Sequence, residues 1–190
     1  MSQTVRLFVA IEIPEEIRNA LASFIKELRS AAPHVKWVRA ENLHVTLKFL
    51  GQTEDTKLAA IEIVLSGVRC ADPVALGFQS LGFFPNEKRP RVFWAGLRAS
   101  PNLRTIAADI DHAVHQLGFL LEERPFTPHL TLARFDPPGI HPKLASIIAE
   151  NNSREFGCMI ARQFHLIQSS LKSTGAEYTT LRSFPFTSET

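Results

Sequence analysis

The chain has 190 residues, of which 45% are hydrophobic, and its 21 Lys and Arg residues nearly balance 19 Asp and Glu residues. This composition is typical of a folded globular protein. It excludes a disordered chain, a coiled coil and a grossly basic nucleic-acid binder, although it leaves room for a local basic cleft. The length allows one large domain or two small lobes, with enough buried surface to fold without crosslinks.

The first half of the chain predicts strands that alternate with two helices. Pro14 and the two acidic residues after it suit the first turn of a helix, whose apolar side chains recur at helical spacing until Pro33 ends the pattern. Thr53 begins a second, shorter helix. In chain order, the predicted elements are a strand at residues 5–13, the first helix, strands at 35–38 and 43–50, the second helix and an extended aromatic segment at 74–84.

The second half follows a polar loop at residues 85–90 and predicts more strands than helices. Ser100 and Pro101 are typical of a helix start, and Gly118 ends the apolar stripe of this third helix. The predicted elements are strands at 91–97 and 126–135 on either side of the third helix, a short helix at 143–150, and strands at 156–160, 164–171 and 178–186.

Several of these strands follow one another directly, which favours an α+β fold with mainly antiparallel sheets. The chain also has a doubled character, because each half contains a long amphipathic helix followed by a strand that carries the pattern His-x-Thr-x. The midpoint of the chain predicts a boundary between two lobes near the polar loop at residues 85–90.

The cysteines and the N-terminus indicate a cellular compartment. Cys70 and Cys158 are the only cysteines, and two cysteines far apart form neither a disulfide framework nor a thiolate zinc site. The apolar run that begins at Leu7 is short and has no cleavage site, so it predicts a strand and not a signal peptide. Because no stretch approaches the ~20 apolar residues that span a bilayer, we expect a reduced, cytoplasmic protein without a membrane partner.

The repeated pattern is the strongest chemical signal in the chain. Its first copy is His44-Val45-Thr46-Leu47, and its second copy is His129-Leu130-Thr131-Leu132. Side chains alternate between the two faces of a strand, so the His and Thr of each copy share one face. A lone His on a strand is usually structural, but two copies of the same tetrapeptide favour a paired catalytic site.

This pair of motifs suits chemistry at a phosphorus atom. If two sheets face each other, two imidazoles can lie on either side of a phosphate. A neutral imidazole can accept a proton from the attacking oxygen, and a protonated one can donate to the departing oxygen, because the ordinary pKa of ~6.5 lies near working pH. Threonine hydroxyls can donate hydrogen bonds to the phosphate oxygens. The pattern therefore predicts acid–base catalysis that requires no metal and no cofactor.

The motifs and their surroundings resemble the two-histidine (2H) phosphoesterase superfamily. Within it, they are similar to the RNA 2′,3′-cyclic phosphodiesterases, a branch also called 2′-5′ RNA ligases. The resemblance implies one bilobal domain over residues 1–190, with pseudo-twofold lobes, outer helices, a central cleft and one motif in each lobe. The segments that carry the resemblance are residues 6–14, 37–38, 42–51, 90–96 and 126–134, with further matches between residues 166 and 178.

The resemblance also implies a reaction and roles for the motif residues. Family members open a terminal 2′,3′-cyclic phosphate to leave a 2′-phosphate. By the family pattern, His44 is the proton donor and His129 the proton acceptor, and Thr46 and Thr131 complete the site. The expected partner is an RNA with a cyclic phosphate end, such as a tRNA half, bound by a monomeric enzyme.

Three alternatives stay open on the sequence alone. The same site can run in reverse and join a cyclic phosphate end to a 5′-hydroxyl, although the abundance of water favours hydrolysis. A relative with a different pocket size can act on small cyclic nucleotides or 2′-5′ linkages. An RNA-binding module without turnover is the alternative from another class of protein.

Two cations near the motifs are candidates for binding the phosphate. Alternation puts Lys48 on the face of His44 and Thr46, where it either steadies the phosphate, lowers the pKa of His44 or lies in water at the rim of the cleft. Arg134 follows the second motif, but strict alternation turns it away from Thr131. A contact between Arg134 and the phosphate therefore requires a bulge or a strand end.

The remaining candidates are weaker. Arg91 either binds RNA phosphate or flanks its strand. Phe8 and Phe49 are candidates for stacking on a base, with core packing as the favoured interpretation. His112 and His115 have a spacing that can bind a metal, but nothing else supports a metal site, and a solvated helix face is the favoured interpretation.

Overall fold

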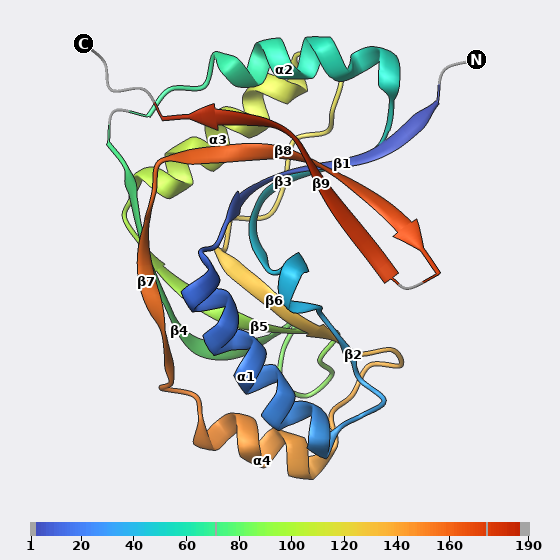
Figure 1. Ribbon diagram of the computed structural model, residues 1–190, viewed down its shortest axis with the longest axis vertical. Helices are drawn as coiled ribbons and strands as arrows, with labels where there is room; N and C mark the ends of the chain where they lie inside the picture. The colour runs from blue at the N-terminus through green and yellow to red at the C-terminus, as the bar shows by residue number, and fades with distance from the viewer. Residues whose placement is uncertain (1–2, 71, 174, 187–190) are drawn as a thin grey trace.

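The computed structural model describes residues 3–70, 72–173 and 175–186, and these form an α+β fold with two antiparallel sheets (Figure 1). The described strands are β1 (Thr4–Glu12), β2 (Lys36–Trp37), β3 (His44–Glu54), β4 (Val74–Phe84), β5 (Val92–Ala99), β6 (His129–Arg134), β7 (Glu155–Ala161), β8 (Gln163–Lys172) and β9 (Gly175–Pro185). The helices are α1 (Glu15–Ala31), α2 (Leu58–Ser66), α3 (Asn102–His115) and α4 (Pro142–Glu150), with short 3₁₀ turns η1 (Ala40–Asn42) and η2 (Asp55–Lys57). The predicted fold class is confirmed.

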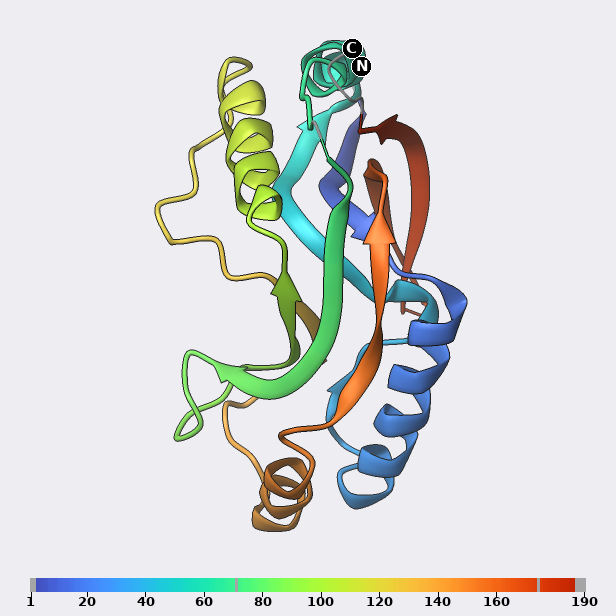
Figure 2. The same ribbon diagram turned by 90° about the vertical axis from the view of Figure 1, so that its left-hand side faces the viewer.

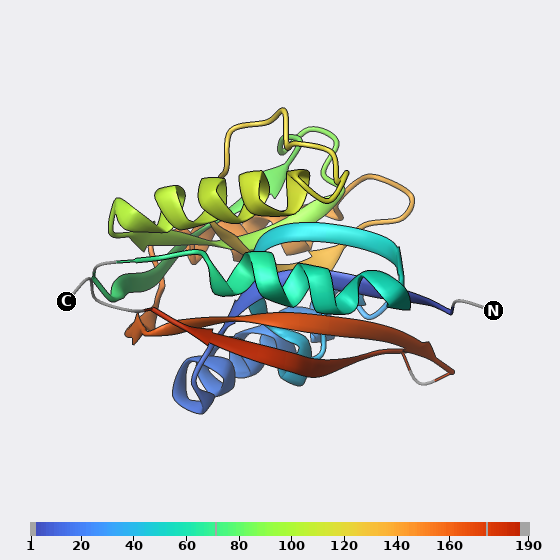
Figure 3. The ribbon, with the colours of Figure 1, turned by 90° about the horizontal axis from the view of Figure 1, so that it is seen from above.

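Each sheet has its own pair of helices. Sheet A has four strands in the order β3-β1-β8-β9, and α2 and α3 lie side by side against it (Figures 1 and 3). Sheet B has five strands in the order β2-β6-β5-β4-β7. Helix α1 lies alongside β7 and also contacts α4 (Figure 2). None of the described helices is both long and apolar enough to span a membrane.

One supersecondary unit occurs twice in the chain. In β1–α1–β3, a strand is followed by a helix and then by a motif strand that pairs antiparallel with the first strand, and β5–α3–β6 has the same order. Each helix crosses to the other sheet, because α1 packs against β7 of sheet B whereas α3 packs against β3 of sheet A. The doubled character expected from the sequence therefore corresponds to this repeated unit.

The predicted boundary at residues 85–90 is wrong. These residues form the loop of the β4–β5 hairpin inside sheet B. Strands β2 and β4 of the first half belong to sheet B, and β8 and β9 of the second half belong to sheet A. A midpoint estimate assumes that strands pair with their neighbours in sequence, whereas each sheet here is completed by strands from the other half.

The core lies between each sheet and its helices. Helix α1 buries the predicted apolar stripe of Ile17, Leu21, Phe24, Ile25 and Leu28. Each such side chain contributes about 1.5–3 kcal/mol by leaving water. Strand β1 is buried on both faces, because a second, small cluster of Phe8, Ala10 and Ile167 lies on the face opposite the main core. This second face of sheet A carries the first motif.

Several predicted element bounds differ from the structure by one to five residues, and two of them show the reason. Strand β6 begins at His129, three residues later than predicted, because Pro128 has no N–H to donate to a ladder. The second helix begins at Leu58, since β3 continues to Glu54, which pairs with Thr4 of β1. In both places, pairing with a distant strand decides where the element starts or ends.

Candidate active site

A bulge in β3 decides which side chains share a face with His44. Along β1, Ala10 is opposite Thr46 and Val9 is opposite Lys48, so Leu47 is an extra residue in β3. Such a bulge reverses the alternation of the side chains that follow it. Leu47 and Lys48 are therefore both buried, and Phe49 returns to the face of His44 and is 59% exposed.

Strand β6 has a bulge at the same place in the second motif. Trp94 of β5 is opposite Thr131, whereas Phe93 is opposite Ala133, so Leu132 is the extra residue. Leu132 and Ala133 are both fully buried, and Arg134 is exposed. The bulge that a contact between Arg134 and the phosphate requires is therefore present. We call the face that carries His and Thr in each sheet its motif face.

The bulge in β3 makes the predicted position of Lys48, on the same face as His44 and Thr46, wrong. Its side chain is only 8% exposed, pairs with Asp111 of α3 and donates a hydrogen bond to the carbonyl oxygen of Leu120 at 2.7 Å. Burial opposes ionisation of Asp111, but hydrogen bonds from Lys48 and from the Glu122 amide lower the pKa of this carboxyl below its ordinary value. Lys48 therefore joins β3 to α3 and to the loop before β6, away from the motif face.

The two motif histidines are oriented in the same way. The Nδ1 atom of His44 lies 2.7 Å from the carbonyl oxygen of Asn42, and that of His129 lies 2.8 Å from the carbonyl oxygen of Thr127. In both copies, the acceptor is two residues before the histidine. Because a carbonyl oxygen only accepts, the proton of each neutral ring belongs on Nδ1, and Nε2 is left free to exchange protons with a ligand.

Aromatic rings border both imidazoles. The rings of Phe8 and Tyr178 lie 4.7 and 5.3 Å from the ring of His44, and Phe49 lies 6.1 Å from Phe8. We call Phe8, Phe49 and Tyr178 the first aromatic flank. The rings of Phe84 and Trp94 lie 4.9 and 6.5 Å from the ring of His129, and these two residues are the second aromatic flank. Each motif thus has its own aromatic surroundings.

Charged groups at the second motif affect the pKa of the histidine in the first motif. Burial lowers the pKa of His44 below its ordinary value. The charges of His129 and Arg134 lower it further, against the hydrogen bond to Asn42. Burial also lowers the pKa of His129, and Arg134 again adds to the shift. These couplings, together with the contacts between β3 and β6, bring the two imidazoles and one guanidinium into a single electrostatic site.

Apart from Lys48, Phe49 and Arg134, the predicted site residues divide into three groups. His44, Thr46, His129 and Thr131 are half-buried on the motif faces. Phe8 is 3% exposed and belongs to the small core cluster, as the core-packing interpretation expected, although its ring touches His44. Arg91 is exposed at the start of β5, and its amide donates to the carbonyl oxygen of Phe84 at 2.8 Å. Nothing in these contacts assigns Arg91 to a ligand.

Four residues at the site are absent from the sequence predictions. Asn42 is 8% exposed, and its side chain donates to the carbonyl oxygen of Ala176 at 2.7 Å, so it holds β9 beside His44. Tyr178 of β9, Phe84 of β4 and Trp94 of β5 complete the aromatic surroundings. Periodicity could have put Trp94 on a sheet face, but only the sheet order shows that this face carries His129.

In the described part of the chain, the side chains that can ligate a metal are not clustered. Among residues 3–70, 72–173 and 175–186, no three His, Cys, Asp or Glu side chains are grouped so as to hold an ion. His112 and His115 are exposed, and their Nδ1 atoms lie 2.8 Å from the carbonyl oxygens of Ala108 and Phe119, respectively. These contacts agree with a solvated helix face.

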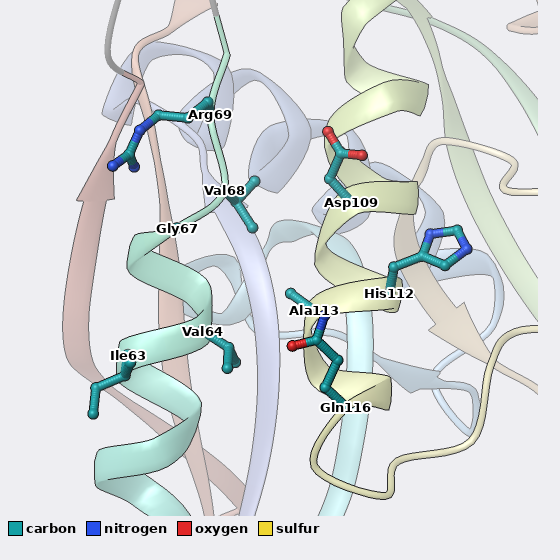
Figure 4. A pocket seen from close by; sticks show the side chains of 9 residues that line it. All are labelled: Ile63, Val64, Gly67, Val68, Arg69, Asp109, His112, Ala113 and Gln116. Carbon is teal, nitrogen blue, oxygen red and sulfur yellow. The ribbon is translucent and has the colours of Figure 1, made fainter.

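A separate hollow of about 510 Å³ lies between α2 and α3 (Figure 4). Its polar side chains, Arg69, Asp109, His112 and Gln116, are all exposed, and it contains none of the motif residues. Since α3 packs on the side of β3 to which Lys48 points, this hollow lies outside the motif faces.

Comparisons with known proteins agree with this geometry. The family model of the 2′-5′ RNA ligase superfamily matches residues 14–172. A protein of Archaeoglobus fulgidus named RNA 2′,3′-cyclic phosphodiesterase is 39% identical and covers 94% of this chain and 99% of its own length. A protein of the same name from Methanothermobacter thermautotrophicus is 34% identical over 95% of this chain and 98% of its own length.

Solved structures share the fold. The protein TT0787 of Thermus thermophilus superimposes with a TM-score of 0.78 at 30% identity, covering 95% of this chain and 97% of its own. LigT of E. coli in its apo form superimposes with a TM-score of 0.75 at 27% identity, covering 98% and 99% of the two chains. LigT has also been solved with 3′-AMP and with phosphate.

Proposed function

The chain belongs to the 2′-5′ RNA ligase superfamily, and on this premise we propose that it hydrolyses the 2′,3′-cyclic phosphate at an RNA end to a 2′-phosphate. The observation that carries the proposal is the matched pair of half-buried imidazoles, each with Nδ1 held by a carbonyl oxygen and Nε2 free. Relatives that carry the name of this activity match nearly the full length of the chain.

The reaction uses one imidazole on each side of the phosphorus atom. Nε2 of His129 accepts a proton from water as the water oxygen attacks phosphorus. The bond from phosphorus to O3′ breaks, and His44, protonated at the start, donates its Nε2 proton to O3′. The product keeps the phosphate on O2′, and each proton transfer contributes about 10²- to 10⁴-fold. Exchange of protons with water returns both histidines to their starting states.

Hydroxyls and one guanidinium meet the charge on the phosphate. Thr46 and Thr131 lie on the motif faces next to the two histidines and can donate to the two non-bridging oxygens. Arg134 is close enough to lower the pKa of both imidazoles, so it is also close enough to attract an anion between them. The residues of this chain therefore supply an acid, a base, two donors and a cation without a metal.

The first aromatic flank supports binding of the terminal base. Phe49 exposes 59% of its surface on the motif face of sheet A and lies beside the ring of Phe8, so its own ring is accessible to a ligand. Stacking of a base on an aromatic ring is worth about 1–3 kcal/mol and tolerates any base. We assign Phe49 and Tyr178 to the base, and Phe8 to the support of Phe49 and His44.

The proposed partner is RNA, bound by a single copy of the chain. Both motifs come from one chain, so a monomer contains the whole site. The exposed Arg91, and Lys88 and Arg89 of the β4–β5 hairpin, can attract the RNA backbone. Cys70 and Cys158 are not paired with each other, which fits the reducing environment of the cytoplasm.

The test uses an oligonucleotide that ends in a 2′,3′-cyclic phosphate, in the presence of a metal chelator. We expect hydrolysis to a 2′-phosphate, and losses of at least about 10²-fold in His44→Ala and in His129→Ala. His112→Ala removes an exposed imidazole from α3 and serves as the matched control with wild-type activity. Full activity of the His44→Ala/His129→Ala double variant, or a product with a 3′-phosphate, would refute the proposal.

A further inference from the structure

One carboxylate distinguishes the two motif histidines from each other. Both rings are held in the same way by a carbonyl oxygen, so these contacts do not decide which ring is the acid. We propose that Glu12 is a positioning residue that keeps the proton on His44, and so makes His44 the proton donor and leaves His129 as the acceptor. This inference rests on the proposed function, because it concerns the acid and the base of that reaction.

The repeated supersecondary unit shows the difference at one position. In the register of β1 and β3, Glu12 is directly opposite His44. In the register of β5 and β6, the residue directly opposite His129 is Gly96. Opposite residues in antiparallel strands point to the same face, with Cβ atoms about 4.5–5.5 Å apart. The first motif therefore has a carboxylate beside its imidazole, whereas the second motif has no side chain at the equivalent position.

The packing around Gly96 prevents a side chain at that position. A Cβ atom on Gly96 would lie 2.5 Å from the hydroxyl oxygen of Ser80 and 3.0 Å from the carbonyl oxygen of Gln79. Strand β4 thus closes the space opposite His129. The asymmetry between the two copies is therefore built into the packing of sheet B as well as into the residue at position 12.

Glu12 is held on the motif face of sheet A. Its Oε1 atom accepts a hydrogen bond from the Thr180 hydroxyl at 2.6 Å. Thr180 lies two residues after Tyr178, whose ring borders His44, so both side chains belong to the same face of β9. No lysine or arginine among the described residues forms an ion pair with Glu12. Its negative charge therefore stays available to His44.

The charge of Glu12 favours the protonated form of the neighbouring imidazole. Burial is the largest influence on the pKa of His44 and lowers it, whereas the charge of Glu12 raises it. Burial also lowers the pKa of His129, and the neighbouring charge that acts there is the positive one of Arg134. Because Asn42 already holds the Nδ1 atom of His44, Glu12 acts on the ring by its charge. The carboxylate therefore opposes the effect of burial on the donor and has no counterpart at the acceptor.

Other charged and titratable groups near Glu12 and His44 come from several elements. They are Arg18 of α1, which donates to the carbonyl oxygen of Ile13, His165 of β8, Tyr178 of β9, and His129 and Arg134 of β6. Burial lowers the pKa of His165, and the charge of Glu12 raises it as well. A change at His165 affects every substrate alike. Two substrates that differ only in their need for an acid therefore separate it from an effect on His44.

The experiment compares adenosine 2′,3′-cyclic phosphate with an analogue in which sulfur replaces the 3′ bridging oxygen. The thiolate departs without a proton, so only the oxygen substrate needs the acid. We expect Glu12→Gln, which keeps the size of the side chain, to lower kcat/KM for the oxygen substrate roughly threefold at pH values above the optimum. Well below the optimum, where His44 is protonated in both enzymes, kcat/KM should be unchanged. The sulfur substrate should show no loss at any pH.

Two further variants complete the experiment. Glu12→Asp retains the charge and should stay close to the wild-type profile on the oxygen substrate. Glu54→Gln removes an exposed carboxylate from the other end of the β1–β3 ladder, where it is opposite Thr4. It is the matched control and should keep wild-type kinetics on both substrates.

The ratio of kcat/KM for the oxygen substrate to kcat/KM for the sulfur substrate, measured in one preparation, is independent of the fraction of folded protein. An unchanged ratio in Glu12→Gln above the optimum, or an equal loss on both substrates, would overturn the proposed role of Glu12. A loss confined to pH values below the optimum would also overturn it, because that limb reports the proton acceptor. A wild-type enzyme that hydrolyses neither substrate would instead refute the proposed function.

Discussion

Arg134 is a charged residue that lowers the pKa of both imidazoles, His44 and His129. Burial is the largest cause that lowers the pKa of His44 and of His129, and the positive charge of Arg134 acts on both rings in the same direction. A lowered pKa keeps each ring neutral at pH 7, which suits the proton acceptor but leaves less of the proton donor in its active form. Binding of an anionic phosphate compensates, because a negative charge favours the protonated imidazole.

These shifts predict the pH dependence of the reaction. We expect a bell-shaped profile of kcat/KM whose centre lies below the ordinary histidine pKa of about 6.5, because both limbs report lowered values. Arg134→Gln removes a charge that lowers both values, so the whole bell should move to higher pH. Arg134→Lys keeps the charge and should leave the bell near its wild-type position. A profile that does not move in Arg134→Gln would contradict the proposed electrostatic coupling.

At the scale of elements, the two bulges decide what sequence periodicity could predict. In the second motif, Leu132 and Ala133 are consecutive apolar residues followed by Arg134, and this break in alternation was a visible sign of the bulge. In the first motif, Leu47 and Phe49 alternate with Lys48 as in a regular strand, so the pattern concealed the bulge. The burial of Lys48 depends on Asp111, which is distant in sequence and unpredictable from β3 alone.

The pair of Lys48 and Asp111 predicts a coupled effect on stability. Their side chains are 8% and 15% exposed, so Lys48→Met leaves a buried carboxylate without its partner. We expect a loss of about 3 kcal/mol in urea unfolding, partly recovered when Asp111→Leu is added. The two changes should therefore be strongly non-additive in a double-mutant cycle. Additive effects of the two substitutions would show that the pair does not stabilise the packing of α3 on β3.

At the scale of the whole molecule, each sheet contains strands from both halves of the chain. The α+β class, most elements and the two motif strands were predictable, because apolar periodicity and the repeated tetrapeptide are local signals. The set of strands in each sheet was not predictable, because the β4–β7 and β1–β8 pairs join segments that are far apart in the sequence. For the same reason, the sequence could indicate the imidazoles and hydroxyls of the proposed site but not Tyr178 or Trp94, which come from strands beside the motif strands.

The histidines also predict how the stability of the whole fold depends on pH. Burial lowers the pKa of His44, His129 and His165 in the folded state below the unfolded value. The unfolded chain therefore binds more protons in the window just below pH 6.5. We expect the free energy of unfolding to be highest above this window and to fall as the pH drops through it.

Urea unfolding at pH 8, 7, 6 and 5 measures this dependence. Of the three histidines, only His165 lies outside the proposed chemistry. His165→Gln should make the decrease in the free energy of unfolding below pH 6.5 shallower than in the wild-type protein. Stability that stays constant, or that rises, between pH 7 and pH 5 would contradict the burial of these imidazoles in their neutral form.

The central claim is that His44 and His129 act on opposite sides of one phosphorus atom, as acid and base. The most direct test replaces the 3′ bridging oxygen of the cyclic phosphate by sulfur, whose thiolate departs without a proton. His44→Ala should then approach the wild-type rate on the sulfur substrate, while it stays at least about 10²-fold slower on the oxygen substrate. His129→Ala should be slow on both substrates. Equal behaviour of the two variants, or rescue of His129→Ala alone, would contradict the account.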